Sequence, residues 1–148
     1  MKLPDWASRL DAYIALANRI PFSYDPARGL DCCRFTFSAI HAQTGIMIGT
    51  QFAGKYRTKR EALLTMKAYC GKPSLQLSIH KLMAESGFER VEEGPYFSQR
   101  GDAVLVPNGA SGDFFGILDT NGRDVLGVGE YGIRRVPISI RCRAWRIG

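Results

Sequence analysis

The sequence has little histidine and no long hydrophobic run. Only two histidines occur, His41 and His80, so chemistry that needs an imidazole has two candidates. The longest strongly apolar stretches, residues 12–17 and 103–107, are far too short to cross a bilayer. Residues 1–5 lack the apolar segment of a signal peptide. We therefore expect a protein with no export signal and no membrane partner.

Cysteine is too sparse for a disulfide scaffold. Four cysteines in 148 residues, without a signal peptide, predict reduced thiols. Cys32 and Cys33 are adjacent and are not expected to bond each other, and no C-x-x-C pair involves Cys70 or Cys142. We predict no metal site and no cofactor for this chain alone, because zinc and iron–sulfur sites need clustered ligands. A thiolate donated to a site shared with a partner stays an alternative.

Positive charge is in excess, with a formal net charge of +6. Nucleic-acid binding needs basic residues gathered on one face, together with aromatics or a known module. The basic clusters here are short and lie at residues 55–60, 134–135 and 141–143. A solvated surface explains them, as does attraction to an anionic assembly partner or cell-wall polymer. We expect no nucleic-acid partner.

The length and the 45% hydrophobic content predict one globular domain, residues 1–148. Apolar residues at helical spacing, bounded by capping residues, glycine and proline, predict four helices at residues 5–18, 31–45, 59–69, closed by Gly71, and 73–87.

The pattern changes after the fourth helix to short apolar runs between turn residues. These runs predict strands at residues 88–91, 103–107, 114–118, 125–128, 133–138 and 144–147, with a hairpin turn at 119–122. The predicted fold class is α+β, with N-terminal helices packed on a C-terminal antiparallel sheet.

Cys32 is the candidate catalytic nucleophile. Asp31 is a plausible N-cap, and the N-terminal end of a helix lowers the pKa of a thiol. Cys33 matches the apolar stripe of the same helix and is expected in the core. His41 lies nine residues beyond Cys32, about 13 Å along one helix, which is too far for a base. His80 is the remaining candidate base, although the sequence does not fix its position relative to Cys32.

The motifs follow one another in the order found in the NlpC/P60 papain-like superfamily. An aromatic loop leads into Asp31-Cys32, residues 100–106 (RGDAVLV) resemble the segment that opens the sheet, and residues 114–118 (FFGIL) resemble the segment that supplies the base. Within the superfamily the chain resembles a family of small phage and prophage proteins, related to the NlpC/P60 domains of tail assemblies. That closer resemblance rests on the D-C-C-x-F motif with its preceding Pro-Phe, and on residues 54–58 and 144–147.

The resemblance implies a papain-like NlpC/P60 fold and assigns roles to individual positions. It places the nucleophile at Cys32 and the histidine at Phe114, so the expected base is replaced by a phenylalanine. The third polar position falls in the apolar residues 125–127. Asp113 lies beside the replaced histidine, but an aspartate is a poor base for a thiol. The implied substrate-binding residues are Phe22, Tyr24, Asp31, Asp113 and Phe114.

The resemblance therefore predicts a structural or assembly protein of the phage tail tip or baseplate, with vestigial peptidase chemistry. Its expected partners are other tail proteins, such as hub, distal tail or fibre proteins, with peptidoglycan as a further ligand. It would be assembled in the host cytoplasm and kept in the virion. The alternative is an active cysteine peptidase or amidase that cleaves peptidoglycan stem peptides during genome entry. A third hypothesis is a metal or cluster ligand completed by a neighbour.

Overall fold

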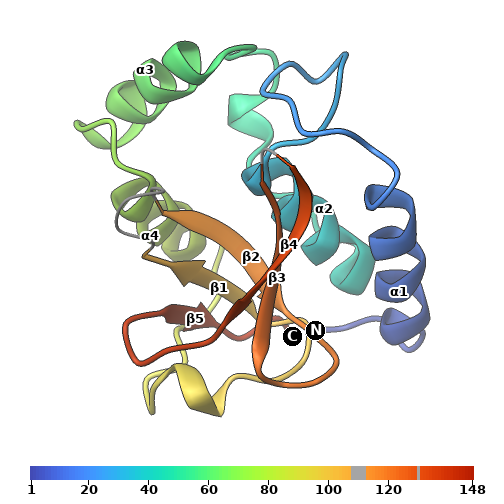
Figure 1. Ribbon diagram of the computed structural model, residues 1–148. Coiled ribbons are helices and arrows are strands. Elements are labelled where there is room, and N and C mark those ends of the chain that lie inside the picture. The colour runs from blue at the N-terminus through green and yellow to red at the C-terminus, as the bar shows by residue number, and fades with distance from the viewer. Residues whose placement is uncertain (108–112, 130) are drawn as a thin grey trace.

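The structure is a computed structural model that describes residues 1–107, 113–129 and 131–148. Helices fill the first part of the chain and strands fill the last part, as the sequence predicts (Figure 1). The helical elements are α1 (Trp6–Ala17), α2 (Cys32–Thr44), η1 (Thr50–Phe52), α3 (Lys59–Cys70), α4 (Leu75–Glu85) and η2 (Pro95–Phe97). The strands are β1 (Ala103–Val106), β2 (Phe114–Leu118), β3 (Asp124–Gly129), β4 (Gly132–Pro137) and β5 (Arg143–Trp145).

The five strands form one antiparallel sheet in the order β4-β3-β2-β1-β5. The fold class α+β is thus confirmed. All residues of β1 and β2 are buried, because both faces of the sheet are covered. Phe115 and Leu105 face the helices and pack with Ile40 of α2 and Leu82 of α4. Phe114 and its neighbours on the opposite face form a second apolar cluster.

Helix boundaries follow the local capping residues. Asp31 caps α2 at its start, and Gly45, with φ of 75°, ends it in the left-handed conformation that glycine adopts readily. The fourth helix begins at Leu75 rather than at Pro73. The hydroxyl of Ser74 accepts the backbone N–H of Leu77 and so makes Ser74 the N-cap.

One predicted strand is wrong. Residues 88–91 make only an isolated bridge between Arg90 and Trp145, with two flanking backbone hydrogen bonds to the chain around β5. Val91 is the buried side chain of this segment, and the chain turns away at Gly94 into η2. The apolar run is therefore too short to continue a ladder along the edge of the sheet.

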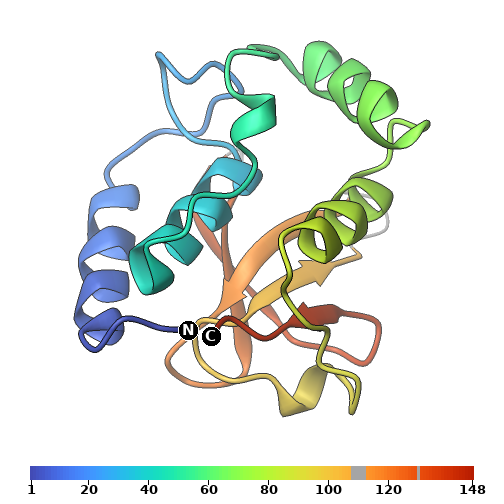
Figure 2. The same ribbon diagram turned by 180° about the vertical axis from the view of Figure 1, so that it is seen from behind.

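The two ends of the chain lie side by side (Figures 1 and 2). A buried carboxylate between them, Asp102, accepts the backbone N–H of Ile147 and pairs with Arg146 at 3.2 Å. Lys2 donates to the backbone carbonyl of Arg100, which lies just before Asp102 in the sequence. The first residues, the last residues and the start of β1 are thus held in one polar cluster.

α3 forms an outer wall that stands away from the sheet (Figures 1 and 2). None of its residues is fully buried, whereas α2 and α4 contribute buried side chains to the core. No helix in the described part of the chain is long and apolar enough to cross a membrane.

Candidate functional site

Asp31 fixes the start of α2 at the centre of the candidate site. Its side chain is 3% exposed. One carboxylate oxygen accepts the backbone N–H of Arg34 at 2.9 Å, and the other accepts Arg34 Nε at 3.0 Å and the hydroxyl of Tyr56 at 2.7 Å. A buried carboxylate needs such partners. Asp31 is therefore a structural anchor for the two cysteines that follow it.

The loop before the helix is tied to the same anchor. The guanidinium group of Arg34 donates a second hydrogen bond, of 2.6 Å, to the backbone carbonyl of Ser23. Phe22 and Leu30 bridge the two ends of the loop, and Gly29 is required there because a Cβ would lie 2.0 Å from the carbonyl oxygen of Pro21. The aromatic loop is thus a closed unit attached to the first turn of α2.

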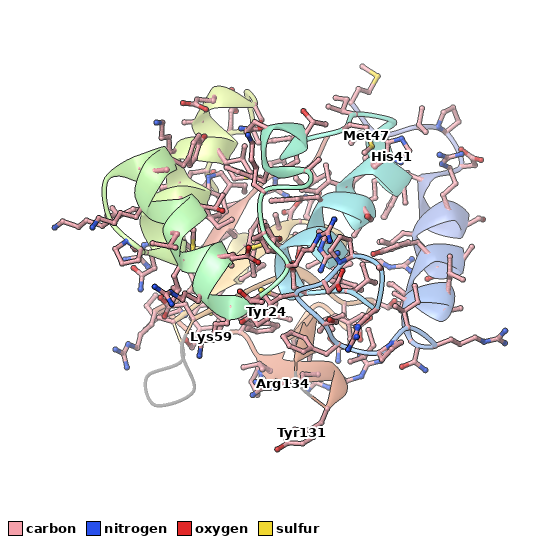
Figure 3. All side chains as sticks on the ribbon, turned by 90° about the horizontal axis from the view of Figure 1, so that it is seen from above. Tyr24, His41, Met47, Lys59, Tyr131 and Arg134 are labelled. Atoms are coloured by element: carbon pink, nitrogen blue, oxygen red, sulfur yellow. The ribbon has the colours of Figure 1, made fainter. Side chains whose placement is uncertain are left out.

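A cleft of about 480 Å³ opens at this end of α2, between α2, η1, α3 and α4. Its lining is mainly apolar, with a few polar groups among the apolar side chains. Tyr24 and Lys59, which are labelled in Figure 3, are both among its lining residues. Of the residues predicted from the sequence, the cleft brings together Tyr24, Asp31, Cys32 and Asp113.

Cys33 also lines the cleft and is half-buried, although the sequence analysis placed it in the core. It packs against the main apolar cluster on one side and borders the cleft on the other. The prediction rested on the apolar stripe of the helix, which Cys33 matches. Here the helix end itself forms the cleft floor, so both residues of the first turn reach it.

The pKa values of the two thiols are shifted in opposite directions. A hydrogen bond from the Cys33 thiol lowers the pKa of Cys32, and one from the backbone of Phe115 adds to it, against the effects of burial and the charge of Asp31. The same thiol–thiol bond, together with burial, raises the pKa of Cys33. The pair therefore loses its first proton from Cys32, while Cys33 keeps its proton and donates.

Phe114 occupies the position at which the resemblance places the catalytic histidine. Its side chain is 6% exposed and packs in an apolar cluster that Cys32, at the start of α2, also contacts. A Cβ on Gly127 would come within 2.0 Å of the ring, so the neighbouring strand is shaped to receive it. Arg134 lies over the ring at 5.9 Å. Phe114 serves packing and does not line the cleft.

Neither histidine is among the residues that line the cleft. His80 packs edge-to-face against Trp145, with ring centroids 5.0 Å apart, and borders a different hollow. Burial lowers the pKa of His80, as do the charges of Arg90 and Arg143. His41 lies in the last turn of α2, opposite the end that carries the cysteines (Figure 3).

Phe22 also lies outside the cleft lining. It packs in the cluster between α1 and the sheet and contacts Tyr24 edge-to-face at 5.2 Å. Phe22 therefore packs against Tyr24, a predicted substrate-binding residue, without itself lining the cleft. Among the described residues, no group of three histidine, cysteine or acidic side chains is arranged to hold a metal ion.

Tyr56 and Lys59 are the site residues that the sequence analysis did not assign. Tyr56 lies within residues 54–58, which carry part of the family resemblance, but nothing local indicates that its hydroxyl reaches Asp31. The hydrogen bond joins residues 25 positions apart. Burial, followed by the charge of Asp31, raises the pKa of Tyr56 far above its ordinary value. Its hydroxyl therefore stays protonated as a donor.

Replacing Tyr56 with phenylalanine is expected to lower the free energy of unfolding by about 1–2 kcal/mol, because Asp31 loses one donor to its buried carboxylate. Chemical denaturation measures the change. The matched control is Tyr131→Phe, whose side chain is 98% exposed and which should change stability by less than about 0.5 kcal/mol. Equal effects of the two substitutions would contradict the anchoring role of Tyr56.

Comparison with known families gives one match. A family model described as a domain of unknown function, DUF6950, matches residues 1–147. No curated protein matches the chain.

Proposed function

The chain belongs to the DUF6950 family, and we propose that it is a binding protein with a papain-like NlpC/P60 fold that has lost its peptidase chemistry. One observation carries the proposal. The thiol of Cys32 stands at a helix start in an apolar cleft, while the position for its base holds Phe114, an apolar residue in a cluster against which Cys32 itself packs. A thiol nucleophile without a base in reach is an incomplete catalytic unit.

The proposal places the protein in a phage tail, at the tip or baseplate. This part rests on the resemblance to small phage and prophage proteins. Its partners there are neighbouring hub, distal tail or fibre proteins, and its apolar cleft is the surface that receives one of them. The protein is assembled in the host cytoplasm and remains in the virion. Peptidoglycan is the further ligand that an ancestral peptidase site suggests.

A hydrolysis assay tests the loss of chemistry. Purified protein incubated with soluble peptidoglycan stem peptides is expected to give no cleavage products by mass spectrometry. The matched variants are Cys32→Ser in the cleft and Cys70→Ser outside its lining. Cleavage that the first variant abolishes and the second leaves intact would overturn the proposal.

Cross-linking tests the binding role. Lys59 lines the cleft and carries a primary amine, so an amine-reactive cross-linker applied to purified particles should join it to a neighbouring tail protein. Lys67, on the same helix but outside the cleft lining, is the control. Absence of this chain from purified particles would refute the placement in the virion.

The second candidate is an active cysteine peptidase or amidase that cleaves stem peptides during genome entry. The hydrogen bond from Cys33 favours it, because it stabilises the Cys32 thiolate without a histidine. The thiolate would attack the amide carbonyl, the C–N bond would break and the amine would leave with a proton from Cys33. Water would then hydrolyse the thioester and restore both thiols. If this mechanism operates, Cys32→Ser and Cys33→Ala should each abolish activity in the hydrolysis assay described above.

A further inference from the structure

A second hollow lies on the side of α4 that carries His80. It has a volume of about 390 Å³ and is lined by residues of α4, of β1 and the position after it, of the β4–β5 connection and of β5: Gln76, His80, Leu105, Pro107, Ile140, Arg141 and Arg143. An adjoining hollow of about 290 Å³ shares Ile140 and Arg143 with it and reaches Arg90. We call this continuous surface, with His80, Arg90, Arg141 and Arg143, the basic groove.

Antiparallel pairing explains why these cations converge. Arg143 pairs with Leu105 across β1 and β5, so its side chain points to the face of the sheet that α4 covers. Trp145 lies on the same face two residues later and holds the ring of His80. Arg90 bridges to Trp145 from the other edge of β5. Residues far apart in the sequence thus meet around one imidazole.

The basic groove carries more positive than negative charge. Arg143 donates to the backbone carbonyl of Cys142 at 2.9 Å, which neutralises no charge. The side chains of Arg90 and Arg141 have no ion pair or hydrogen bond with any described residue. Two acidic side chains are nearby. Glu92 borders the smaller hollow, and Asp113 accepts a hydrogen bond from Gln76 at the edge of the larger one.

We propose that the basic groove binds a ligand with two linked phosphate groups. Guanidinium groups match phosphate oxygens in shape and charge and bind them with paired hydrogen bonds. Two hollows that meet at Arg143 provide one position for each phosphate, with Arg141 and His80 at the first and Arg90 at the second. This inference is independent of the proposed function, because the groove shares no lining residue with the cleft.

The two histidines provide a direct test by NMR. Pyrophosphate, titrated at constant ionic strength, is expected to shift the imidazole signals of His80 in a saturable way and leave those of His41 unchanged. Bound phosphate favours the imidazolium form, so the pKa of His80, lowered in the free protein by burial and by Arg90 and Arg143, should rise by about 1 unit. Inorganic phosphate should bind about tenfold more weakly, because it fills one position instead of two.

Single substitutions locate the site. Arg90→Gln and Arg141→Gln, which break no side-chain hydrogen bond or ion pair with a described residue, should each weaken pyrophosphate binding about tenfold, the effect of one charge-assisted hydrogen bond. Arg60→Gln removes the same charge from α3, and its affinity should match that of the unmodified protein. Equal losses in all three variants, equal shifts at both histidines, or no shift at His80 would each overturn the proposal.

Discussion

Replacing Asp102 with alanine is expected to lower the free energy of unfolding by about 2–6 kcal/mol, because two backbone donors lose their acceptor at about 1–3 kcal/mol each. Asp102 is fully buried and accepts the backbone N–H groups of Gln99 at 2.8 Å and Ile147 at 3.0 Å. Alanine would leave both donors unpaired beside Arg146. Since the same carboxylate holds the end of the chain to the start of β1, the loss should also release the C-terminal residues.

Urea denaturation measures this loss, and hydrogen exchange at Ile147 reports the local release. Asp5→Ala is the matched control, because the Asp5 side chain is exposed and makes no capping hydrogen bond. It should change stability by less than about 0.5 kcal/mol. Comparable losses from the two substitutions would show that the polar cluster at the chain ends does not stabilise the fold.

The charge of Asp102 itself opposes folding. Burial raises the pKa of its carboxyl, against the hydrogen bonds from Gln99 and Ile147 and the charges of Arg146 and Lys2. The folded protein therefore binds this proton more tightly than the unfolded chain. The contribution of Asp102 to stability is largest below the ordinary pKa of an aspartate and falls as the pH rises through its folded-state value. Hydrogen-bond geometry, rather than charge, explains why the residue stabilises the fold.

Alkylation of Cys32 by iodoacetamide is expected to have a pH midpoint below the ordinary thiol value of about 8.5. The reason is the hydrogen bond from Cys33, which favours the thiolate. Cys33→Ser keeps a donor at this position and Cys33→Ala removes it. The alanine variant should therefore have a midpoint about 1 pH unit higher than the serine variant, and react about tenfold more slowly near neutral pH.

Peptide mass spectrometry gives the labelling rates, and both variants remove the ambiguity of two adjacent cysteines in one peptide. Cys70 is unsuitable as a reference thiol. Although burial raises the pKa of Cys70, hydrogen bonds from Ser78 and from the backbone outweigh burial, and the pKa is lowered overall. The chain unfolded in guanidinium is the proper reference. Identical midpoints in the serine and alanine variants would show that Cys33 does not control the thiol.

These outcomes bear on the two candidate functions differently. If the peptidase site has lost its function, Cys32 should be reactive but stem peptides should not be hydrolysed. The helix start and Cys33 remain in that case, while the base is absent. A reactive Cys32 with Cys33-dependent hydrolysis is what an active enzyme predicts. Reactivity alone therefore does not separate them, and the hydrolysis assay decides.

Local interactions made the element boundaries readable from the sequence. Asp31 and Gly45 bound α2, Gly71 ends α3, and residues 119–122 form the predicted turn between β2 and β3, with Gly122 at φ of 69°. Each of these signals depends on residues within a few positions of one another. The replacement of the expected histidine by Phe114 could also be predicted from the motif, because this prediction requires the alignment of one short segment only.

Tertiary structure decided which side chains share a site. The sequence indicated neither that Tyr56 closes on Asp31, nor that Cys33 reaches the cleft, nor that His80 lies with Arg90 and Arg143 in the basic groove. These contacts join residues separated by many positions, and they depend on how α4 and β5 pack against the rest of the sheet. Periodicity and capping determine where an element begins and which residues share its faces, whereas packing between distant elements determines what those faces meet.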